Sequence, residues 1–226
     1  MFTGLIQQVG KLAAKKEADG SLRLIIRTQG WNPPLSKGES IAVNGVCLTV
    51  AQVTNQGFDC DVLEETVRCS NLNAKQTGAP LNLERAVRLG EPLGGHLITG
   101  HVEGLGTLIR KMNAGRDWRL DFSCDISLLR LIVPKGSVAC DGISLTVASL
   151  TDFSFSVNII PFTWANTNLH LLPEGETVNL ETDLIGKYVF RRLEQNQRSE
   201  VRDQKSEENP ARPITEDILR QAGFME

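Results

Sequence analysis

The sequence predicts an all-β protein made of two tandem small barrels and a C-terminal α-helix. Three observations predict this fold: an internal duplication, short segments in which every second residue is apolar, and one amphipathic segment after the second copy. The chain has 226 residues, which is enough for two domains of about 100 residues, each with its own core.

The composition is that of an ordinary globular protein. Apolar residues make up 41% and charged residues 23%, and the formal net charge is −3, so the sequence does not predict binding to nucleic acid. The longest apolar runs, 22–26 and 126–133, are too short or are interrupted by Arg, whereas a membrane span needs about 20 apolar residues. We therefore expect no membrane association and no export signal.

Cysteine and histidine usage favours a reducing, cytoplasmic environment. The cysteines are odd in number and include no CxxC pair, which argues against a disulfide framework or a zinc knuckle. They are Cys47, Cys60, Cys69, Cys124 and Cys140. The three histidines show no HExxH spacing, so we predict no metal site.

The duplication is visible as motifs that recur at a constant separation. NGVCLTV at 44–50 and DGISLTV at 141–147 share Gly, Leu, Thr and Val in register, 97 positions apart. The same separation relates further pairs: Thr66 and Thr163, Asn71–Leu72 and Asn168–Leu169, and 82–84 and 179–181, both of sequence NLE. Thr3–Gly4 and Thr99–Gly100 are 96 positions apart. The sequence therefore predicts one module over 1–96 and a second over 97–186.

Period-two alternation predicts strands within the first copy. The segments are LRLII (22–26), SIAV (40–43), VCLTV (46–50) and FDCDV (58–62). Turn residues at Gly20, Asn44–Gly45 and Gln56–Gly57 are spaced as in an antiparallel sheet, and helical signals are short, near 64–72 and 164–172. A closed barrel is favoured because closure removes exposed strand edges, and a sandwich is the alternative.

After the second copy the pattern becomes helical. In 184–198, Leu184, Val189, Leu193 and Tyr188 fall on one face with charges opposite. Such a helix packs either on its own chain or on other copies, and we favour the second. The segment 199–213 is charged and contains two prolines, so we expect a disordered linker, and 214–224 predicts a short helix.

Each copy carries a pair of small polar residues opposite its apolar face. Alternation places Cys47 and Thr49 on one face of their strand, and Ser144 and Thr146 on the matching face of theirs. These faces are either solvated or ligand-binding. Their presence in both copies favours two similar pockets for two similar molecules.

The glycine-rich segment GGHLITGHVEGLG (94–106) joins the modules and contains two of the three histidines. Glycines permit close backbone approach to a ligand, and His101 is able to transfer a proton near neutral pH. A simple flexible linker is the alternative. Neither GxGxxG nor GxxxxGK[ST] occurs, so a nucleotide-phosphate site is not expected.

Taken together, MFTG, NGVCLTV, GGHLITGH, DGISLTV and the two NLE segments resemble the riboflavin synthase family, alpha-chain type, over about residues 1–190. The resemblance implies two six-stranded antiparallel Greek-key barrels and a trimerisation helix over 187–198 that assembles a homotrimer. It says nothing about residues 199–226, for which the composition predicts a charged, flexible tail. It implies the dismutation of two 6,7-dimethyl-8-ribityllumazine molecules to riboflavin and 5-amino-6-(ribitylamino)uracil, with no cofactor and no metal. Association with lumazine synthase stays open.

The resemblance also implies site residues. It gives the N-terminal pocket Gly4, Leu5, Ile6, Cys47, Leu48, Thr49, Asp61, Val62, Leu63, Glu64, Glu65 and Thr66. It gives the C-terminal pocket Gly100, His101, Val102, Lys135, Ser144, Leu145, Thr146, Ile159, Ile160, Pro161, Phe162, Thr163 and Trp164. His101 is the expected acid–base residue, assisted by Cys47, Ser144, Thr146 and Asp183, and Phe2 is expected to cover a bound ring. The two copies carry different side chains at this position, Cys47 in the first and Ser144 in the second. Because a free thiol ionises at about pH 8.5 and a hydroxyl does not, the two pockets are able to play different roles.

One position departs from the family pattern: Phe162 stands where an acidic residue is frequent, so one pocket wall is expected to be more apolar. Two rival functions are a non-catalytic lumazine- or flavin-binding protein, like the antenna proteins of luminous bacteria, and a structural trimeric scaffold. Retention of Cys47, Thr49, His101, Ser144 and Thr146 favours catalysis over the binding protein. Absence of tight, saturable lumazine binding would favour the scaffold.

Overall fold

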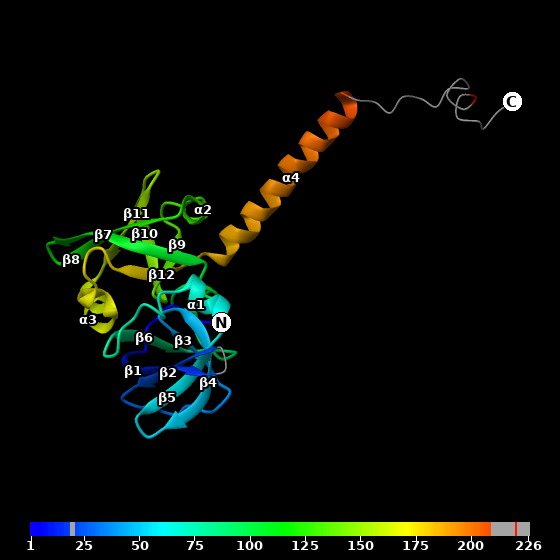
Figure 1. The fold of residues 1–226 in the computed structure, drawn as a ribbon. Coiled ribbons are helices and arrows are strands. Elements are labelled where there is room, and N and C mark those ends of the chain that lie inside the picture. The colour runs from blue at the N-terminus through cyan, green and yellow to red at the C-terminus, as the bar shows by residue number, and fades with distance from the viewer. Residues whose placement is uncertain (19–20, 209–219, 221–226) are drawn as a thin grey trace. The chain divides into compact units, whose positions relative to one another are not determined.

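The structure, a computed structural model, describes residues 1–18, 21–208 and 220. Residues 1–187 form one compact unit, and Tyr188 begins a second unit. The first unit contains two closed six-stranded antiparallel barrels, which confirms the predicted fold class and excludes the sandwich (Figure 1).

The first barrel consists of β1 (Gln8–Ala18), β2 (Ser21–Arg27), β3 (Ser40–Val43), β4 (Val46–Thr54), β5 (Gly57–Val62) and β6 (Pro80–Arg85). Its order around the barrel is β1-β2-β5-β4-β3-β6. In this order three hairpin-connected strands, β3, β4 and β5, are followed by β6, which returns to lie beside β3. That arrangement is a Greek key.

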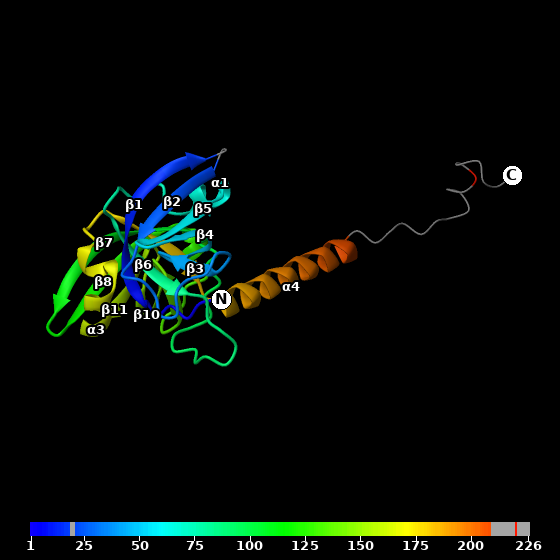
Figure 2. The same ribbon diagram turned by 90° about the horizontal axis from the view of Figure 1, so that it is seen from below.

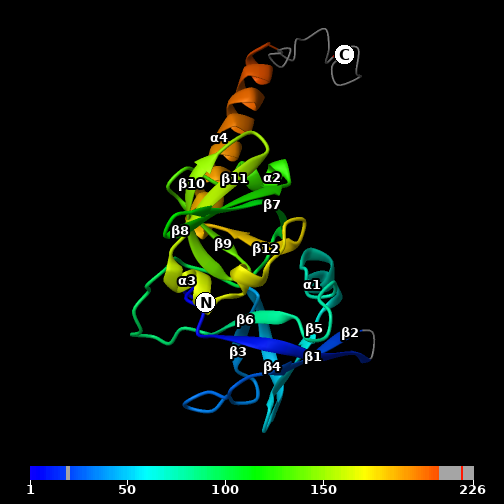
Figure 3. The ribbon, with the colours of Figure 1, turned by 90° about the vertical axis from the view of Figure 1, so that its left-hand side faces the viewer.

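The second barrel repeats this topology with β7 (Gly104–Ala114), β8 (Asp117–Cys124), β9 (Ser137–Cys140), β10 (Ile143–Leu150), β11 (Ser154–Ile159) and β12 (Thr177–Thr182). The short helices are α1 (Glu64–Cys69), α2 (Ile126–Leu129), α3 (Pro161–Asn166) and the 3₁₀ turn η1 (Asn168–Leu171). α1 and α3 occupy matching places in the two copies, and they lie on opposite sides of the region where the barrels meet (Figures 1 and 3).

Alternation along the strands fills the two barrel cores. In β4, Val46, Leu48 and Val50 are buried, whereas Cys47 is half-buried and Thr49 is exposed. The buried residues join the core of the first barrel, and an equivalent cluster fills the second barrel. The polar face predicted from the sequence therefore lies on the outside of each barrel.

The barrels meet through two equivalent hairpin turns. Asn44–Gly45 joins β3 to β4 and Asp141–Gly142 joins β9 to β10, and all four residues have positive φ, as in type I′ turns. A Cβ atom added to Gly45 would lie 2.6 Å from the backbone nitrogen of Gly142. The two turns are thus packed backbone against backbone, which only glycine permits.

A buried polar cage surrounds this contact. The carboxylate of Asp141 accepts hydrogen bonds from the backbone N–H of Asn179 (2.8 Å) and from the side-chain amide of Asn168 (2.9 Å). Asn82 donates to the backbone oxygen of Asp141 at 3.0 Å, and Asn179 donates to that of Asn44 at 2.8 Å. Because each barrel supplies partners for the other, these bonds fix the relative placement of the two barrels.

The segments that precede the barrels cross between them. Phe2 and Ile98 form an antiparallel bridge. The backbone N–H of Ser144, in the second barrel, donates to the oxygen of Gly4 at 2.9 Å, and the N–H of Cys47, in the first barrel, donates to the oxygen of Gly100 at 2.9 Å. Each entering segment therefore lies against the other barrel.

α4 (Leu184–Glu208) follows the second barrel. It begins at Leu184, as the helical pattern predicts and before residue 187, where the resemblance places the start of the trimerisation helix. It continues through 199–208, where the sequence pattern predicts a disordered linker. The physical reason is that this stretch is rich in residues with good helix propensity, and both prolines come later, at 210 and 213. The helix predicted over 214–224 lies outside the described residues except for position 220.

In the described part of the chain, no helix has the length and apolar character that a membrane span requires. Figure 2 gives a second view of the barrels and α4.

Candidate functional site

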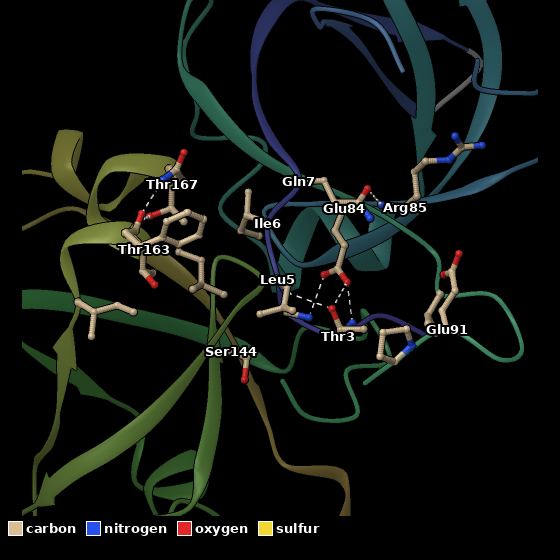
Figure 4. A pocket seen from close by; sticks show the side chains of 17 residues that line it. Thr3, Leu5, Ile6, Gln7, Glu84, Arg85, Glu91, Ser144, Thr163 and Thr167 are labelled. Carbon is tan, nitrogen blue, oxygen red and sulfur yellow. Dashed lines mark hydrogen bonds between the residues drawn. The ribbon is translucent and has the colours of Figure 1, made fainter. Parts of the chain in front are cut away.

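The larger of two related cavities lies between the barrels beside Ser144, and we name it the Ser144 cavity. Its volume is about 710 Å³. Its lining comprises Thr3, Gly4, Leu5, Ile6, Gln7, Glu84, Arg85, Val87, Glu91, Pro92, Ile143, Ser144, Ile160, Phe162, Thr163, Asn166 and Thr167. In Figure 4, Leu5 and Ile6 lie between Thr163 on the α3 side and Glu84 on the first barrel.

The second cavity, named the Cys47 cavity, has a volume of about 220 Å³. It is lined by Val46, Cys47, Glu65, Thr66, Cys69, Gly100, His101 and Val102. Each of these eight residues has a counterpart in the other copy, at a separation of 97 or 96 positions, and all eight counterparts line the Ser144 cavity. The duplication has therefore produced two equivalent cavities.

The predicted assignment of the entering segments to pockets is wrong. The resemblance places Gly4–Ile6 in the N-terminal pocket and Gly100–Val102 in the C-terminal pocket, but each segment lines the cavity of the other barrel. The reason is the crossing of the two segments, which repeat matching does not detect. His101 consequently shares a cavity with Cys47 and Thr66, not with Ser144.

Two buried carboxylates hold the crossing segments in place. Glu84 accepts hydrogen bonds from the backbone N–H and hydroxyl of Thr3 and from the N–H of Gly4. Glu181 accepts the same three bonds from Thr99 and Gly100, at 2.7, 2.6 and 2.9 Å. Burial raises the pKa of Glu84, and its hydrogen bonds oppose this shift. Both residues are the glutamates of the repeated NLE segments, 82–84 and 179–181, and this repetition is the sequence signal that marks them.

Ser144 is paired with a histidine that sequence reasoning missed. The Nδ1 atom of His96 lies 2.7 Å from the Ser144 hydroxyl oxygen. Burial lowers the pKa of His96, and the nearby carboxylates of Asp183 and Glu181 oppose this effect. A neutral imidazole beside a hydroxyl is able to accept its proton. The sequence signal is the first histidine of GGHLITGH, of which only the second, His101, is a predicted site residue.

The buried His96 predicts a pH-dependent stability. Because its folded-state pKa lies below the ordinary value of 6.5, its contribution is complete above pH 6.5 and is lost as the pH falls through the lowered pKa. We expect His96→Asn to lose less stability than the unsubstituted chain when the pH is lowered from 7 to 5, measured by urea unfolding. Ser144→Ala keeps the buried imidazole and should retain the dependence; identical profiles for all three chains would contradict the assignment.

Several predicted site residues lie in the barrel cores. Leu48, Val62, Leu145 and Ile159 are buried among the core side chains. They alternate with the outward-facing residues of their strands, so they support the cavities from behind and do not line them. Phe2 is also fully buried, packed with Ile98 between the barrels, and this burial argues against its predicted role as a cover for a bound ring.

Other predicted residues lie outside the two cavities, most of them on the surface. Asp61 pairs with Arg23 across β2 and β5. Trp164 stacks on Trp118 with ring centroids 4.3 Å apart, on the core side of α3. The remaining predicted residues outside the lining sets are Thr49, Leu63, Glu64, Lys135, Thr146, Pro161 and Asp183. Of these, Asp183 lies near His96, and its Oδ1 accepts the backbone N–H of Ile185 at the start of α4.

In the part of the chain that the structure describes, titratable side chains do not gather into a metal site. Within the described ranges, no group of three or more His, Cys, Asp or Glu residues has an arrangement that would hold a metal ion. The five cysteines are free thiols. Proton transfer by His96 and His101, and nucleophilic assistance by Cys47 and Ser144, are the reactions that the residues around the cavities can support.

Comparison with known proteins identifies the repeated unit. A family model described as "Lumazine binding domain" matches residues 3–86 and again residues 99–183. The riboflavin synthase of Actinobacillus pleuropneumoniae is 37% identical over 224 residues, covering 99% of this chain and 100% of the relative. This chain belongs to the riboflavin synthase family. The riboflavin synthase of Bacillus subtilis is 36% identical over 225 residues, with the same coverage, and that of Mycobacterium bovis is 40% identical over 196 residues, covering 84% of this chain and 97% of the relative.

Solved structures of another protein share the fold of this riboflavin synthase family member. LumP complexed with 6,7-dimethyl-8-(1'-D-ribityl) lumazine matches with a TM-score of 0.71 at 22% identity, and LumP complexed with riboflavin matches with 0.73 at 23% identity. Both matches cover 80% of this chain and 99% of LumP. At this identity they show a shared double-barrel fold, and the riboflavin synthase relatives carry the family assignment.

Proposed function

We propose that this chain is a riboflavin synthase that converts two molecules of 6,7-dimethyl-8-ribityllumazine into riboflavin and 5-amino-6-(ribitylamino)uracil by transfer of a four-carbon unit. The observation that supports this most is the pair of equivalent but chemically unequal cavities in one chain. A dismutation needs two copies of one compound in two different roles. Two sites of common origin with different side chains meet that requirement.

The two cavities suit different parts of the reaction. In the Ser144 cavity, the hydroxyl oxygen of Ser144 adds to C7 of one lumazine, the pteridine ring takes up the displaced electron pair, and the hydroxyl proton passes to the neutral imidazole of His96. In the Cys47 cavity, His101 receives a proton from the acidic 7-methyl group of the second lumazine. Thr66 and Thr163 stand at matching positions in the two cavities and are suited to hold ring polar atoms. Alignment of the two rings removes much of the entropic barrier, up to about 7–11 kcal/mol in well-oriented systems.

We further propose that the complete site forms between subunits of a cytoplasmic homotrimer. α1, beside the Cys47 cavity, and α3, beside the Ser144 cavity, lie on opposite sides of the barrel contact (Figure 3). This placement of the two helices favours a stacked pair in which the second ring is supplied by another copy of the chain. The exposed apolar residues Tyr188, Val189 and Leu193 give α4 a face that suits self-association. Sedimentation equilibrium of the full chain tests this, since a monomer at micromolar concentration would contradict it.

The purified full chain is expected to form riboflavin when 6,7-dimethyl-8-ribityllumazine is the only substrate, because one compound supplies both donor and acceptor. The measurement is the appearance of riboflavin absorbance and fluorescence with loss of two lumazines per riboflavin, with and without a chelator. Binding without turnover would contradict the enzymatic assignment and favour a lumazine carrier. Absence of both binding and turnover would favour a structural scaffold.

His101→Gln is the variant that separates catalysis from binding within this proposal. It should lower kcat by about 100-fold, the contribution typical of a positioned acid–base group, and leave lumazine affinity within about threefold. His170→Gln is a suitable control because His170 lines neither cavity. Equal losses of kcat and affinity in His101→Gln would assign this residue a binding role only.

A further inference from the structure

His101 lies between two anchored ends of its segment. On one side, Thr99–Gly100 is held by the carboxylate of Glu181. On the other side, the backbone N–H of Glu103 donates to the oxygen of Leu180 at 3.0 Å. The His101 side chain itself is exposed, so its position in the Cys47 cavity follows the backbone of the segment. The groups that hold both ends therefore decide where the imidazole stands.

The side chain of Glu103 joins the second anchor to α4. Its Oε2 atom accepts hydrogen bonds from the backbone N–H of Thr182 at 2.9 Å and from the Thr182 hydroxyl at 2.7 Å. Its Oε1 atom forms an ion pair with the ammonium of Lys187, in the first turn of α4. The two side chains are only 24% and 23% exposed. A half-buried ion pair with two further hydrogen bonds is held more firmly than a surface pair.

The first copy has the same anchor without the charges. Gln7 is the counterpart of Glu103, 96 positions earlier. Its backbone N–H donates to the oxygen of Leu83 at 3.0 Å, and its amide oxygen accepts the backbone N–H of Arg85 at 3.0 Å. Both bonds are equivalent to those of Glu103. The second copy has therefore kept the anchor and replaced a neutral amide by a carboxylate.

The cation of the pair has no counterpart in the first copy. The position 97 residues before Lys187 is Gly90, in the connection between β6 and β7. The segment of the first copy carries Leu5 where the second carries His101, and a leucine side chain transfers no proton. The charged link is thus present beside the acid–base residue and absent from the equivalent segment without one.

Lys187 stands at the boundary between the two units of the chain. It is the last residue of the compact unit that contains the barrels, and Tyr188 begins the second unit. The exposed apolar side chains of Tyr188 and Val189 follow it directly. Because a helix is rigid over a few turns, contacts made by this apolar face also restrain the Lys187 side chain.

We propose that Glu103 and Lys187 are positioning residues for His101, and that their ion pair carries the placement of α4 to the segment 99–103. This proposal rests on the proposed function, in which His101 takes the proton from the 7-methyl group. Neither Glu103 nor Lys187 lines a cavity, so neither contacts the lumazine there. Loss of the pair therefore lowers turnover and leaves the binding surfaces intact.

The test is a double-mutant cycle with a rescue variant and a control. Lys187→Met removes the cation and keeps an unbranched side chain, and Glu103→Gln keeps an acceptor for Thr182. Lys187→Arg restores the positive charge. The control is Asp121→Asn, because Asp121 is paired with Arg119 on the same barrel, at 15% and 38% exposure, and neither residue lines a cavity.

We expect Lys187→Met and Glu103→Gln each to lower kcat about tenfold, less than the roughly 100-fold cost of a 1 Å displacement. Lumazine affinity, measured by fluorescence titration, should stay within threefold. The double variant should lose no more than either single variant, since all three lack the same pair. Lys187→Arg and Asp121→Asn should stay within twofold of the unsubstituted chain.

A second measurement does not depend on turnover. The oxygen of Gly100 accepts the backbone N–H of Cys47 at 2.9 Å, so the segment covers this thiol. Labelling of Cys47 by a small thiol reagent, followed by peptide mass spectrometry, should accelerate several-fold in Lys187→Met and stay unchanged in Asp121→Asn. Light scattering should give all variants the mass of the unsubstituted chain.

The proposal is overturned if Lys187→Met matches Asp121→Asn in kcat and labelling, or if the losses of the two single variants are additive. It is also overturned if kcat falls only together with a loss of assembly, which would make Lys187 an assembly residue. If the unsubstituted chain binds lumazine without forming riboflavin, the proposed function fails, while the labelling comparison still decides whether the pair holds the His101 segment.

Discussion

Glu181→Ala is expected to lower the free energy of unfolding by about 3–4 kcal/mol, because three donors lose a charged acceptor inside the protein. The donors are the N–H and hydroxyl of Thr99 and the N–H of Gly100, all within 2.9 Å of the carboxylate. The substitution also removes the desolvation cost of the buried carboxylate, which offsets part of this loss of stability. Riboflavin formation should fall by about 100-fold, the effect of misplacing a catalytic group by about 1 Å, because His101 follows Gly100.

The measurements are urea unfolding and steady-state kinetics at a temperature where the variant is folded. Glu181→Gln keeps one acceptor oxygen and should lose about half as much stability. A loss below about 1 kcal/mol in Glu181→Ala would show that water replaces the carboxylate.

The same variant also tests the crossing of the entering segments. Although Glu181 belongs to the second barrel, the segment that it holds covers Cys47 of the first barrel. Labelling of Cys47 by a small thiol reagent, followed by peptide mass spectrometry, should therefore accelerate several-fold in Glu181→Ala. In the matched Glu84→Ala variant, the loosened segment is Thr3–Gly4, so labelling of Cys47 should change little.

The strands and the duplication were predictable because both leave a local mark in the sequence. Alternation in 46–50 predicts which side chains enter the core, and the structure buries Val46, Leu48 and Val50 as expected. The pair Asn44–Gly45 predicts a tight hairpin turn for the same local reason. These features depend on neighbours along the chain, so one sequence was enough to find them.

The barrel contact was not predictable in the same way. Asn82 and Asn179 are recognisable as matching positions, but nothing local indicates that each one bonds to the turn of the opposite copy. Repeat matching relates residues to their counterparts and says nothing about which copy they touch. The same limit led to the wrong pocket for Leu5 and His101, since crossing of the segments is a tertiary feature.

Gly45→Ala is expected to destabilise the folded chain by about 4 kcal/mol, more than most single substitutions. One part of this cost is the positive φ of 79° at Gly45, which an L side chain adopts at a cost of about 1 kcal/mol or more. The larger part is steric, because the new Cβ would lie 2.6 Å from the backbone nitrogen of Gly142. Backbone atoms cannot rotate away as a flexible side chain can. The barrels must therefore separate slightly, which strains the hydrogen bonds of the buried polar cage around the two turns.

The chain contains a matched control for this prediction. Gly78 has a φ of 91°, and a Cβ atom added there would meet no atom within 4 Å, so Gly78→Ala isolates the conformational cost and should lose only about 1 kcal/mol. Urea unfolding of both variants gives the difference, which is the steric cost of the barrel contact. In the double variant Gly45→Ala, Gly142→Ala, the second substitution should cost much less than the first, because the turns are already separated. Full additivity, or equal losses in Gly45→Ala and Gly78→Ala, would mean that the two turns do not meet in solution.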